Sequence, residues 1–407
     1  MDLKKMLSEK LIELLLAYLC EQGEGDLCKL SNPEWKALLR LSTYHGVAPL
    51  FYHRLSHAGA QVPDGVLNAL CKAYHGNVFQ NAQYYHELSE VLKQLQRIDV
   101  IVLKGAYLAK TVYQSQALRF IGDIDLLVKK ADLEQAEKIL LEMGYGPTER
   151  PSIKAQCASH HLETFTKKGA FSIDIHWTLI KPEAPFKIMP DSLWEQARPF
   201  TVEDIQVLTL SPEDLLFHLC VHTAYSSRFF GIRFLCDIHN TIRSHEIDWE
   251  ILFHRARQWK GEKTVYLVLS LARDWLATSV PEKVLEQFKP DDFNLELLAK
   301  TKEIITKDIN PRVGENFARL WKPNKPFREK LLIFLKRIFL PPDELAEIYH
   351  APKKSLRLYF YYPVRLKKYL VSYSGAVWRG LRSDKEKQVF MTQNERIAML
   401  MDWMKSN

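Results

Sequence analysis

The sequence predicts an α+β fold, in which a small mixed β-sheet core is joined to helical N- and C-terminal regions. Apolar residues recur three and four positions apart up to about residue 97 and again beyond about residue 209, which is the period of an α-helix. Between these stretches, short β-branched and alternating runs are typical of strands. We therefore expect a helical region over 1–97, an α/β core over 98–208 and a second helical region over 209–407.

The first helical region contains a break between two helices. Within residues 35–55, the run 45–49 interrupts the helical period. Gly46 can end one helix there and Pro49 can open the next, because proline is tolerated in the first turn of a helix. The sequence therefore predicts a helical hairpin in this segment.

The core is expected to contain both strands and helices. Strands are predicted over 100–103, 124–128, 162–165 and 171–175, and helices over 107–113 and 132–143. Gly144 is a common type of helix-ending residue, and Gly169 can supply the positive φ that a tight turn requires. The last two strands are therefore predicted to form an antiparallel hairpin around the turn 167–170.

The second helical region opens at Ser211-Pro212-Glu213-Asp214. Serine can cap a helix, proline suits its first position and acids are favourable in its first turn. The helical period then continues nearly to the end of the chain. Breaks between helices are expected at the proline-containing segments 322–326 and 341–342.

The composition argues against several classes of protein. Hydrophobic residues make up 47% and charged residues 26% of the chain, which does not fit a largely disordered or collagen-like protein. The apolar stretches are shorter than the about 20 residues of a membrane-spanning helix, and the N-terminus lacks the apolar segment of a signal peptide. The six cysteines form no C-x-x-C pair, so we expect reduced thiols in a cytoplasmic protein.

Asp123 and Asp125 form the sharpest motif in the sequence. They lie two positions apart in a predicted strand, and because strand side chains alternate, both carboxylates face the same way. A divalent cation most easily relieves the repulsion between them, and Mg²⁺ is the usual choice beside phosphate. The alternative is a solvated strand face without a metal.

Asp174 is a third acid within a strand pattern. Ile173 and Ile175 flank it and are expected to face the opposite way. Burial of an unpaired carboxylate is costly, whereas a position beside Asp123 and Asp125 at a metal site compensates the charge. The alternative is an ion pair with an arginine or lysine of the core.

Upstream of Asp123, the sequence contains three residues of types that bind phosphate, namely Lys104, Gly105 and Arg119. Lys104 and Gly105 lie where a strand is expected to meet a helix, a position where backbone N–H groups can approach an anion. Lys104 and Arg119 also supply cations for a triphosphate or for the neighbouring aspartates. Each could instead form a structural ion pair.

Several histidines and one charged pair complete the candidates. His176 lies two positions after the third acid, on the same strand face, and is a candidate for supporting a metal ligand or contacting substrate. His218 and His222 have an i, i+4 spacing that can bind a metal, but we expect a structural role on a helix face. Arg233 and Asp237 have the same spacing and are expected to pair along one helix.

Together these motifs resemble the uncharacterised nucleotidyltransferase family of the DNA polymerase β-like superfamily. The resemblance is carried, in this order, by Leu103-Lys104-Gly105, Arg119, the run 123–128 and Asp174-Ile175-His176-Trp177. A weaker likeness extends to segments 45–50, 212–237 and 341–349. The resemblance implies a nucleotidyltransferase-like core over 98–208.

The resemblance also implies a nucleotide-binding site. Gly105 would open the nucleotide pocket, and Lys104, Arg119 and His176 are further candidates for binding the nucleotide. The bound nucleotide would be a nucleoside triphosphate such as ATP.

Catalysis, by the same resemblance, would depend on Asp123, Asp125 and Asp174 and on two Mg²⁺ ions that they bind. Asp174 would help to deprotonate a hydroxyl group as it attacks the α-phosphorus, and pyrophosphate would leave. Most of the rate would come from positioning and electrostatics. The acceptor is a small molecule, a carbohydrate, a protein or a nucleic acid.

The first motif departs from better-known members of the superfamily, which carry a Gly-Gly or Gly-Ser pair. Lys104-Gly105-Ala106 offers one glycine and no hydroxyl, and Lys104 would replace some of the missing phosphate contacts. The alternative hypothesis is therefore a catalytically silent protein of the same fold that binds a nucleotide or a macromolecular partner.

Basic and aromatic residues interleave over residues 353–387. This composition suits a nucleic-acid groove or a helix lying on an anionic lipid surface, and the net charge of +7 is compatible with either. The alternative is an aromatic face packed into the protein, with the cations in water.

Overall fold

A computed structural model of the chain describes residues 3–21, 27–148, 159–182 and 184–306. Beyond them it describes residues 328, 335, 339–342, 345, 358–367 and 384–406. The chain divides into two compact units, of which the larger comprises Met1–Pro147 and His160–Thr306 and the smaller Thr148–Ser159 and Lys307–Ser406.

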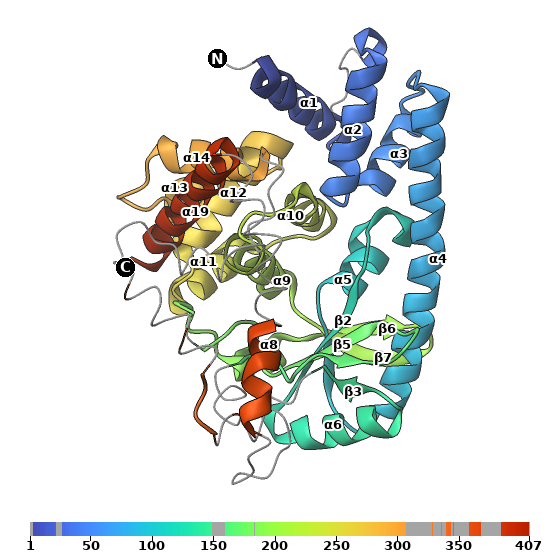
Figure 1. The fold of residues 1–407 in the computed structure, drawn as a ribbon, viewed down its shortest axis with the longest axis vertical. Helices are drawn as coiled ribbons and strands as arrows, with labels where there is room; N and C mark the ends of the chain where they lie inside the picture. The colour runs from blue at the N-terminus through green and yellow to red at the C-terminus, as the bar shows by residue number, and fades with distance from the viewer. Residues whose placement is uncertain are drawn as a thin grey trace. The chain divides into compact units, whose positions relative to one another are not determined.

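The larger unit is built on a seven-stranded mixed sheet of order β3-β4-β5-β2-β1-β7-β6 (Figure 1). The strands are β1 (Val100–Val102), β2 (Asp123–Val128), β3 (Gly146–Pro147), β4 (Phe165–Thr166), β5 (Ser172–His176), β6 (Arg198–Val202) and β7 (Ile205–Thr209). At the centre of the order, β2 pairs antiparallel with β1 and parallel with β5. The predicted α+β class is confirmed, whereas β3, β6 and β7 were not expected from the sequence.

Four helices precede the sheet: α1 (Leu3–Leu19), α2 (Asn32–Tyr44), α3 (Ala48–His57) and α4 (Asp64–Gln94), with a short 3₁₀ turn at Leu27–Lys29. The predicted hairpin is confirmed, because α2 ends at Tyr44, Gly46 takes a positive φ of 69° and Pro49 lies in the first turn of α3. The long helix α4 continues past this hairpin and contacts β6 and β7 (Figure 1).

The strands are joined by short helical segments. These are α5 (Gly105–Tyr107), a π-helical turn η2 (Leu108–Val112), 3₁₀ turns η3 (Gln116–Leu118) and η4 (Lys130–Asp132), and helices α6 (Leu133–Glu142) and α8 (Pro190–Gln196). Gly144 follows α6 with a φ of 84°, and Gly169 has a φ of 81° between β4 and β5, which pair antiparallel. The predicted helix end and hairpin are therefore confirmed.

The rest of the larger unit is helical. It contains α9 (Pro212–Val221), a π-helical turn η5 (His222–Ser226), α10 (Ile232–Ser244), α11 (Trp249–Gln258), α12 (Glu262–Leu276), α13 (Glu282–Phe288) and α14 (Leu295–Thr306). Ser211 caps α9 as predicted, since its hydroxyl accepts a hydrogen bond from the backbone N–H of Asp214 at 3.2 Å.

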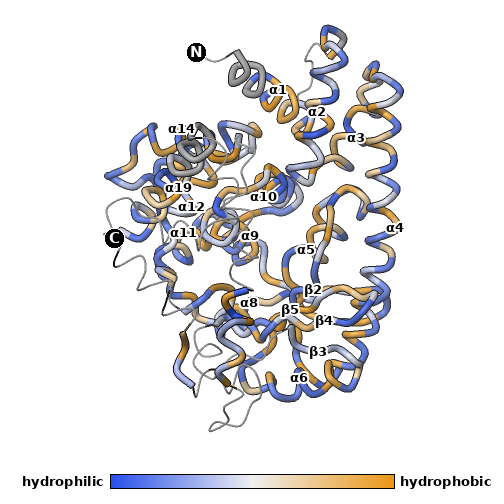
Figure 2. The backbone as a smooth tube through the Cα atoms, in the orientation of Figure 1, coloured by the Kyte–Doolittle hydropathy of each residue, from blue (hydrophilic) through white to orange (hydrophobic). Residues whose placement is uncertain are grey.

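Apolar burial explains how these elements pack. In Figure 2, hydrophobic and hydrophilic colours alternate along α4 and α6, which is typical of helices with one packed and one solvated face. Along β2, every residue after Asp123 is buried. Helix α12 is enclosed along most of its length, and its Val265, Leu269 and Leu271 side chains are all fully buried. Strand β2 and helix α12 are therefore both core elements of the larger unit.

The described cysteines agree with the expectation of free thiols. Cys20, Cys220 and Cys236 are buried free cysteines, and Cys71 is half-buried and free. The side chain of Cys28 and all of Cys157 lie outside the described residues. Among the described residues, we find no helix that combines the length and the apolar character needed to span a bilayer.

The smaller unit contains helix α19 (Asp384–Lys405) and a helical stretch over residues 358–367. In that stretch Leu358 is buried against Leu345, whereas Tyr359 and Phe360 are exposed. The helix break expected at 322–326 and most of the basic and aromatic segment 353–387 lie outside the described residues.

Candidate functional site

Three aspartates meet on one face of the sheet because of the register between β2 and β5. Asp125 lies directly opposite Asp174 in this parallel pair. The pleat of β2 places Asp123 on the same face as Asp125, and the pleat of β5 does the same for Asp174 and His176. Residues about fifty positions apart in the sequence are thus brought to adjacent strands.

Asp125, Asp174 and His176 form a cluster that can hold a metal ion. Each offers one ligand atom, and these atoms all lie within 4.8 Å of one another. His176 Nε2 is 2.9 Å from Asp125 Oδ1. Asp174 Oδ1 and His176 Nδ1 are buried and have no hydrogen-bond partner among the described residues. Because buried polar atoms are rarely left unpaired, this donor set fits a divalent cation.

The carboxylates of β2 differ in environment. Asp125 is only 8% exposed, whereas Asp123, at the start of the strand, is exposed and lies outside the cluster. The negative charge of Asp125, together with burial, raises the pKa of Asp123 to about 6. Burial also acts to raise the pKa of Asp125, but Lys104 and His176 outweigh it and hold that pKa well below its usual range.

Lys104 lies at the junction of β1 and α5 in a strained backbone conformation. Its φ is 37° and its ψ is −104°, which non-glycine residues rarely adopt. The conformation places its Nζ atom 3.3 Å from Asp125 Oδ2, and both side chains are largely buried. Lys104 therefore contacts Asp125 directly, in line with the expectation that it supplies a cation to the neighbouring aspartates.

Gly105 packs against the loop that leads into β2. A Cβ atom at this position would lie 3.0 Å from Ile121 Cγ2 and 3.1 Å from Arg119 Nη1. The absence of a side chain lets the loop approach α5 closely. The resemblance-based role of Gly105, to open the nucleotide pocket, stays a prediction.

Arg119 forms a buried ion pair with Asp237 of α10. Its Nε and Nη2 atoms donate to Asp237 Oδ1 and Oδ2 at 2.8 and 2.9 Å. Tyr113 also donates to Asp237 Oδ1, at 2.7 Å. Arg119 thus forms a structural ion pair, which is one of the two alternatives for this residue. The pair expected between Arg233 and Asp237 is not found among the described contacts.

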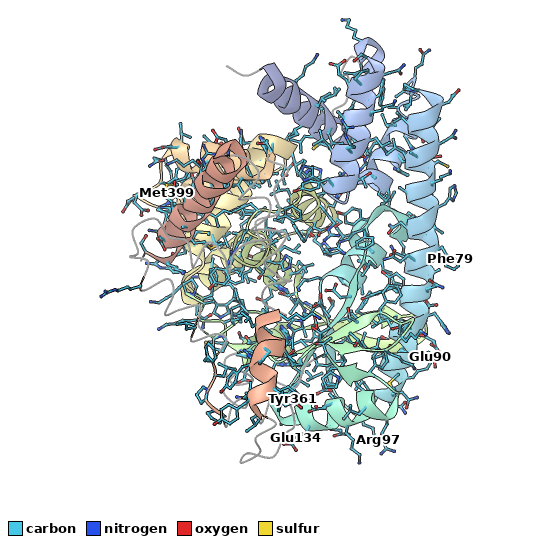
Figure 3. All side chains as sticks on the ribbon, viewed as in Figure 1. Phe79, Glu90, Arg97, Glu134, Tyr361 and Met399 are labelled. Atoms are coloured by element: carbon cyan, nitrogen blue, oxygen red, sulfur yellow. The ribbon has the colours of Figure 1, made fainter. Side chains whose placement is uncertain are left out.

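The inner face of α4 holds the loop before β2 through side-chain amides. Asn81 Nδ2 donates to the carbonyl oxygens of Gln116 and Arg119 at 2.6 and 2.8 Å. Asn77 Nδ2 donates to the Ala117 carbonyl at 2.6 Å. Figure 3 shows the opposite side of the helix, where the labelled Phe79 and Glu90 point outward. This amide row positions Arg119 and was not anticipated from the sequence.

Besides His176 itself, four histidines lie near the cluster. The rings of His160 and His161 are 5.3 and 5.2 Å from that of His176. Burial, followed by the charges of neighbouring groups, lowers the pKa of His160 to about 2, so this ring is neutral. Burial lowers the pKa of His218 in the same way.

His218 of α9 and His222 of η5 have a spacing that by itself predicts a structural role. The charges of Lys104 and Asp125 both act on His218, and that of His222 acts on Asp125. Both histidines therefore lie close enough to the cluster to interact with its charges. The i, i+4 spacing could not reveal this, because it does not specify which face of a helix packs on the sheet.

Comparison with known proteins agrees with the motif-based resemblance. A family model described as "Uncharacterised nucleotidyltransferase" matches residues 31–277. The match covers all seven strands and the helices from α2 to α12, and it includes every residue of the site described above. No curated protein and no solved structure matches the chain.

Proposed function

The chain belongs to the uncharacterised nucleotidyltransferase family, and we propose that it transfers a nucleoside monophosphate from a nucleoside triphosphate to a hydroxyl group of an acceptor. The observation that carries this proposal is the cluster of Asp125, Asp174 and His176, whose ligand atoms lie within 4.8 Å of one another. Asp123 lies on the same strand face, at its exposed end. Such a site can bring negatively charged phosphates to carboxylates only if a cation intervenes.

The proposed cofactor is Mg²⁺, two ions of which would be held by Asp123, Asp125 and Asp174. When bound, the ions would neutralise the charge that develops on the phosphate oxygens. The unpaired, buried Asp174 Oδ1 atom supports this assignment. His176 would hold Asp125 in place through the 2.9 Å contact of Nε2 with Oδ1.

Asp174 is the proposed base. The acceptor oxygen would form a bond to the α-phosphorus while the bond from that phosphorus to the bridging oxygen breaks, and pyrophosphate would leave. The hydroxyl proton would pass to the Asp174 carboxylate, which is half-buried and has one oxygen unpaired among the described residues. Lys104 would approach the phosphates from its position beside Asp125.

The test measures binding and turnover separately, since the acceptor is unidentified. Each nucleoside triphosphate is titrated calorimetrically into the wild type and into Asp125→Asn, with and without Mg²⁺, and pyrophosphate release is followed with a panel of hydroxyl compounds. We expect Mg²⁺-dependent binding that Asp125→Asn abolishes. Asp191→Asn, an exposed acid of α8, is the control. Full pyrophosphate release by Asp125→Asn would refute the proposal.

A catalytically silent member of the family is the second candidate. The observation that favours it is the position of Lys104 Nζ, 3.3 Å from Asp125 Oδ2, where an ammonium group already neutralises a carboxylate that a metal would need. A silent protein would bind nucleotide equally well without Mg²⁺. It would also release no pyrophosphate with any acceptor in the panel.

A further inference from the structure

Arg233 is a cation near Asp123 that forms no ion pair with any described residue. Lys104 pairs with Asp125 and Arg119 pairs with Asp237. In the part of the chain that the structure describes, Arg233 has no carboxylate within the 4.0 Å of an ion pair, and its guanidinium N–H groups donate no hydrogen bond. Among the described residues, therefore, no carboxylate pairs with it directly, although the charges of Asp237 and Asp123 act on it from further away.

The guanidinium of Arg233 is held between aromatic rings. Its Cζ atom lies 4.9 Å from the ring centroid of Phe234 and 5.8 Å from that of Phe120. A Cβ atom on Gly46 would lie 3.6 Å from both Cδ and Nη1 of Arg233, so the loop between α2 and α3 also lies against this side chain. These contacts hold the side chain, but among the described residues none of them gives its five N–H donors an acceptor.

The surroundings of Arg233 favour an anion. The side chain is half-buried, and burial together with the charge of Arg119 lowers its pKa, although a guanidinium stays protonated. A partly desolvated charge without an acceptor is costly. An oxyanion with several oxygens would relieve this cost through bidentate hydrogen bonds.

Arg233 lies at the open end of β2. Phe120, against which it packs, is three residues before Asp123 and is 39% exposed. The Phe120 ring also approaches Gly122, whose added Cβ would lie 3.4 Å from Cε1. Residues 120–123 thus connect the ring on which the Arg233 guanidinium packs to the exposed Asp123.

We propose that Arg233 binds the diphosphate group formed by the β- and γ-phosphates of the donor, which leaves as pyrophosphate. This inference rests on the proposed function. It adds to the site a binding residue, Arg233, which the sequence spacing instead predicts to pair with Asp237. Phosphate oxygens match the fork of a guanidinium, and the other arginine of this region, Arg119, already pairs with Asp237.

The experiment uses inorganic pyrophosphate as the probe, with Mg²⁺ present. Calorimetric titrations compare the wild type with Arg233→Gln and Arg233→Lys. Arg243→Gln is the matched control, because Arg243 lies on the same helix, is exposed and pairs with Glu21 at 2.8 Å. We expect Arg233→Gln to weaken pyrophosphate binding at least tenfold, Arg233→Lys to weaken it several-fold and Arg243→Gln to leave it unchanged.

The outcome separates this inference from the proposed function. Equal pyrophosphate affinity in the wild type and Arg233→Gln, or no binding to the wild type, would overturn the role of Arg233 even if nucleotide transfer occurs. Arg233-dependent pyrophosphate binding without transfer to any acceptor would support this role and argue against the enzyme. Arg233→Lys retains the positive charge. If Arg233→Gln does not fold, the pyrophosphate affinity of Arg233→Lys tests the role of Arg233 instead.

Discussion

Asp237 of α10 accepts two hydrogen bonds from Arg119, from Nε at 2.8 Å and from Nη2 at 2.9 Å, across 118 positions of sequence. The exposed fraction of the Arg119 side chain is 7%, and that of the Asp237 side chain is 0%. The pair ties the loop that leads into β2 to a helix far along the chain. The position of the aspartates on β2 therefore depends on a contact with the second helical region.

Breaking this pair should strongly destabilise the protein. Asp237→Ala leaves the Arg119 guanidinium buried without its partner, and we expect a loss of about 3–5 kcal/mol in the free energy of unfolding. Urea denaturation measures this loss. Glu282→Gln, which removes the partner of Arg273 in an exposed pair, should cost less than about 1 kcal/mol. Similar losses in the two variants would show that the buried pair has no special role.

The amide row on α4 should matter for the same loop. Asn81→Leu removes the donor to two carbonyl oxygens, those of Gln116 and Arg119. We expect a loss of about 1–3 kcal/mol in the free energy of unfolding, because those oxygens lose a buried partner. The control is Phe79→Ala, since Phe79 is 66% exposed on the outer side of the helix. Denaturation curves that coincide for the wild type and Asn81→Leu would contradict the role of the row.

The strand period accounts for what could be predicted of the site. Asp123, Asp125 and Asp174 were identified because alternation along a strand is a local property. The pairing of Arg119 with Asp237 was not predicted, because α10 is positioned by packing that sequence spacing does not encode. The hairpin of β6 and β7 was missed because its turn has no glycine, and Glu203 instead adopts a positive φ of 51°.

A methyl group at Gly105 should disturb the loop before β2. Gly105→Ala places Cβ 3.0 Å from Ile121 Cγ2 and 3.1 Å from Arg119 Nη1, which forces these side chains to shift. We expect a cost of about 1–3 kcal/mol in the free energy of unfolding, measured by urea denaturation. Gly76→Ala is the matched control, because Gly76 lies in α4 with no atom within 4 Å of an added Cβ. That variant should gain about 1 kcal/mol.

His45 should make the fold sensitive to acid. Its ring is buried, its two nitrogen atoms have no hydrogen-bond partner among the described residues, and burial lowers its pKa to about 4. In the unfolded chain His45 binds a proton near pH 6.5, whereas in the folded chain it binds one only near pH 4. The stability that is present above pH 6.5 is therefore lost as the pH falls toward 4. The loss attributable to this ring is about 3 kcal/mol.

His45→Leu tests this linkage. Urea denaturation at pH 7 and at pH 4.5 gives the change in the free energy of unfolding for each protein. The variant should lose less stability on acidification than the wild type, because it removes one group that titrates only in the unfolded state. An equal loss in both proteins would assign the acid sensitivity to other residues.

His176 should determine which metal the site prefers. Mg²⁺ favours oxygen ligands, whereas Mn²⁺ also accepts imidazole nitrogen, and the donor cluster contains one imidazole beside two carboxylates. We therefore expect wild-type protein to bind Mn²⁺ more tightly than Mg²⁺, as measured by calorimetry and by Mn²⁺ electron paramagnetic resonance. His176→Gln should weaken Mn²⁺ binding about tenfold and Mg²⁺ binding less.

The size of the difference between the two metals separates a ligand from a supporting residue. If His176 only orients Asp125 through its 2.9 Å contact, glutamine weakens both metals by the same factor. If its nitrogen coordinates the ion, the loss is larger for Mn²⁺, because Mg²⁺ gains little from a nitrogen ligand. His75→Gln, at an exposed position of α4, controls for the loss of a histidine elsewhere. Unchanged affinity of His176→Gln for both metals would exclude the imidazole from either role.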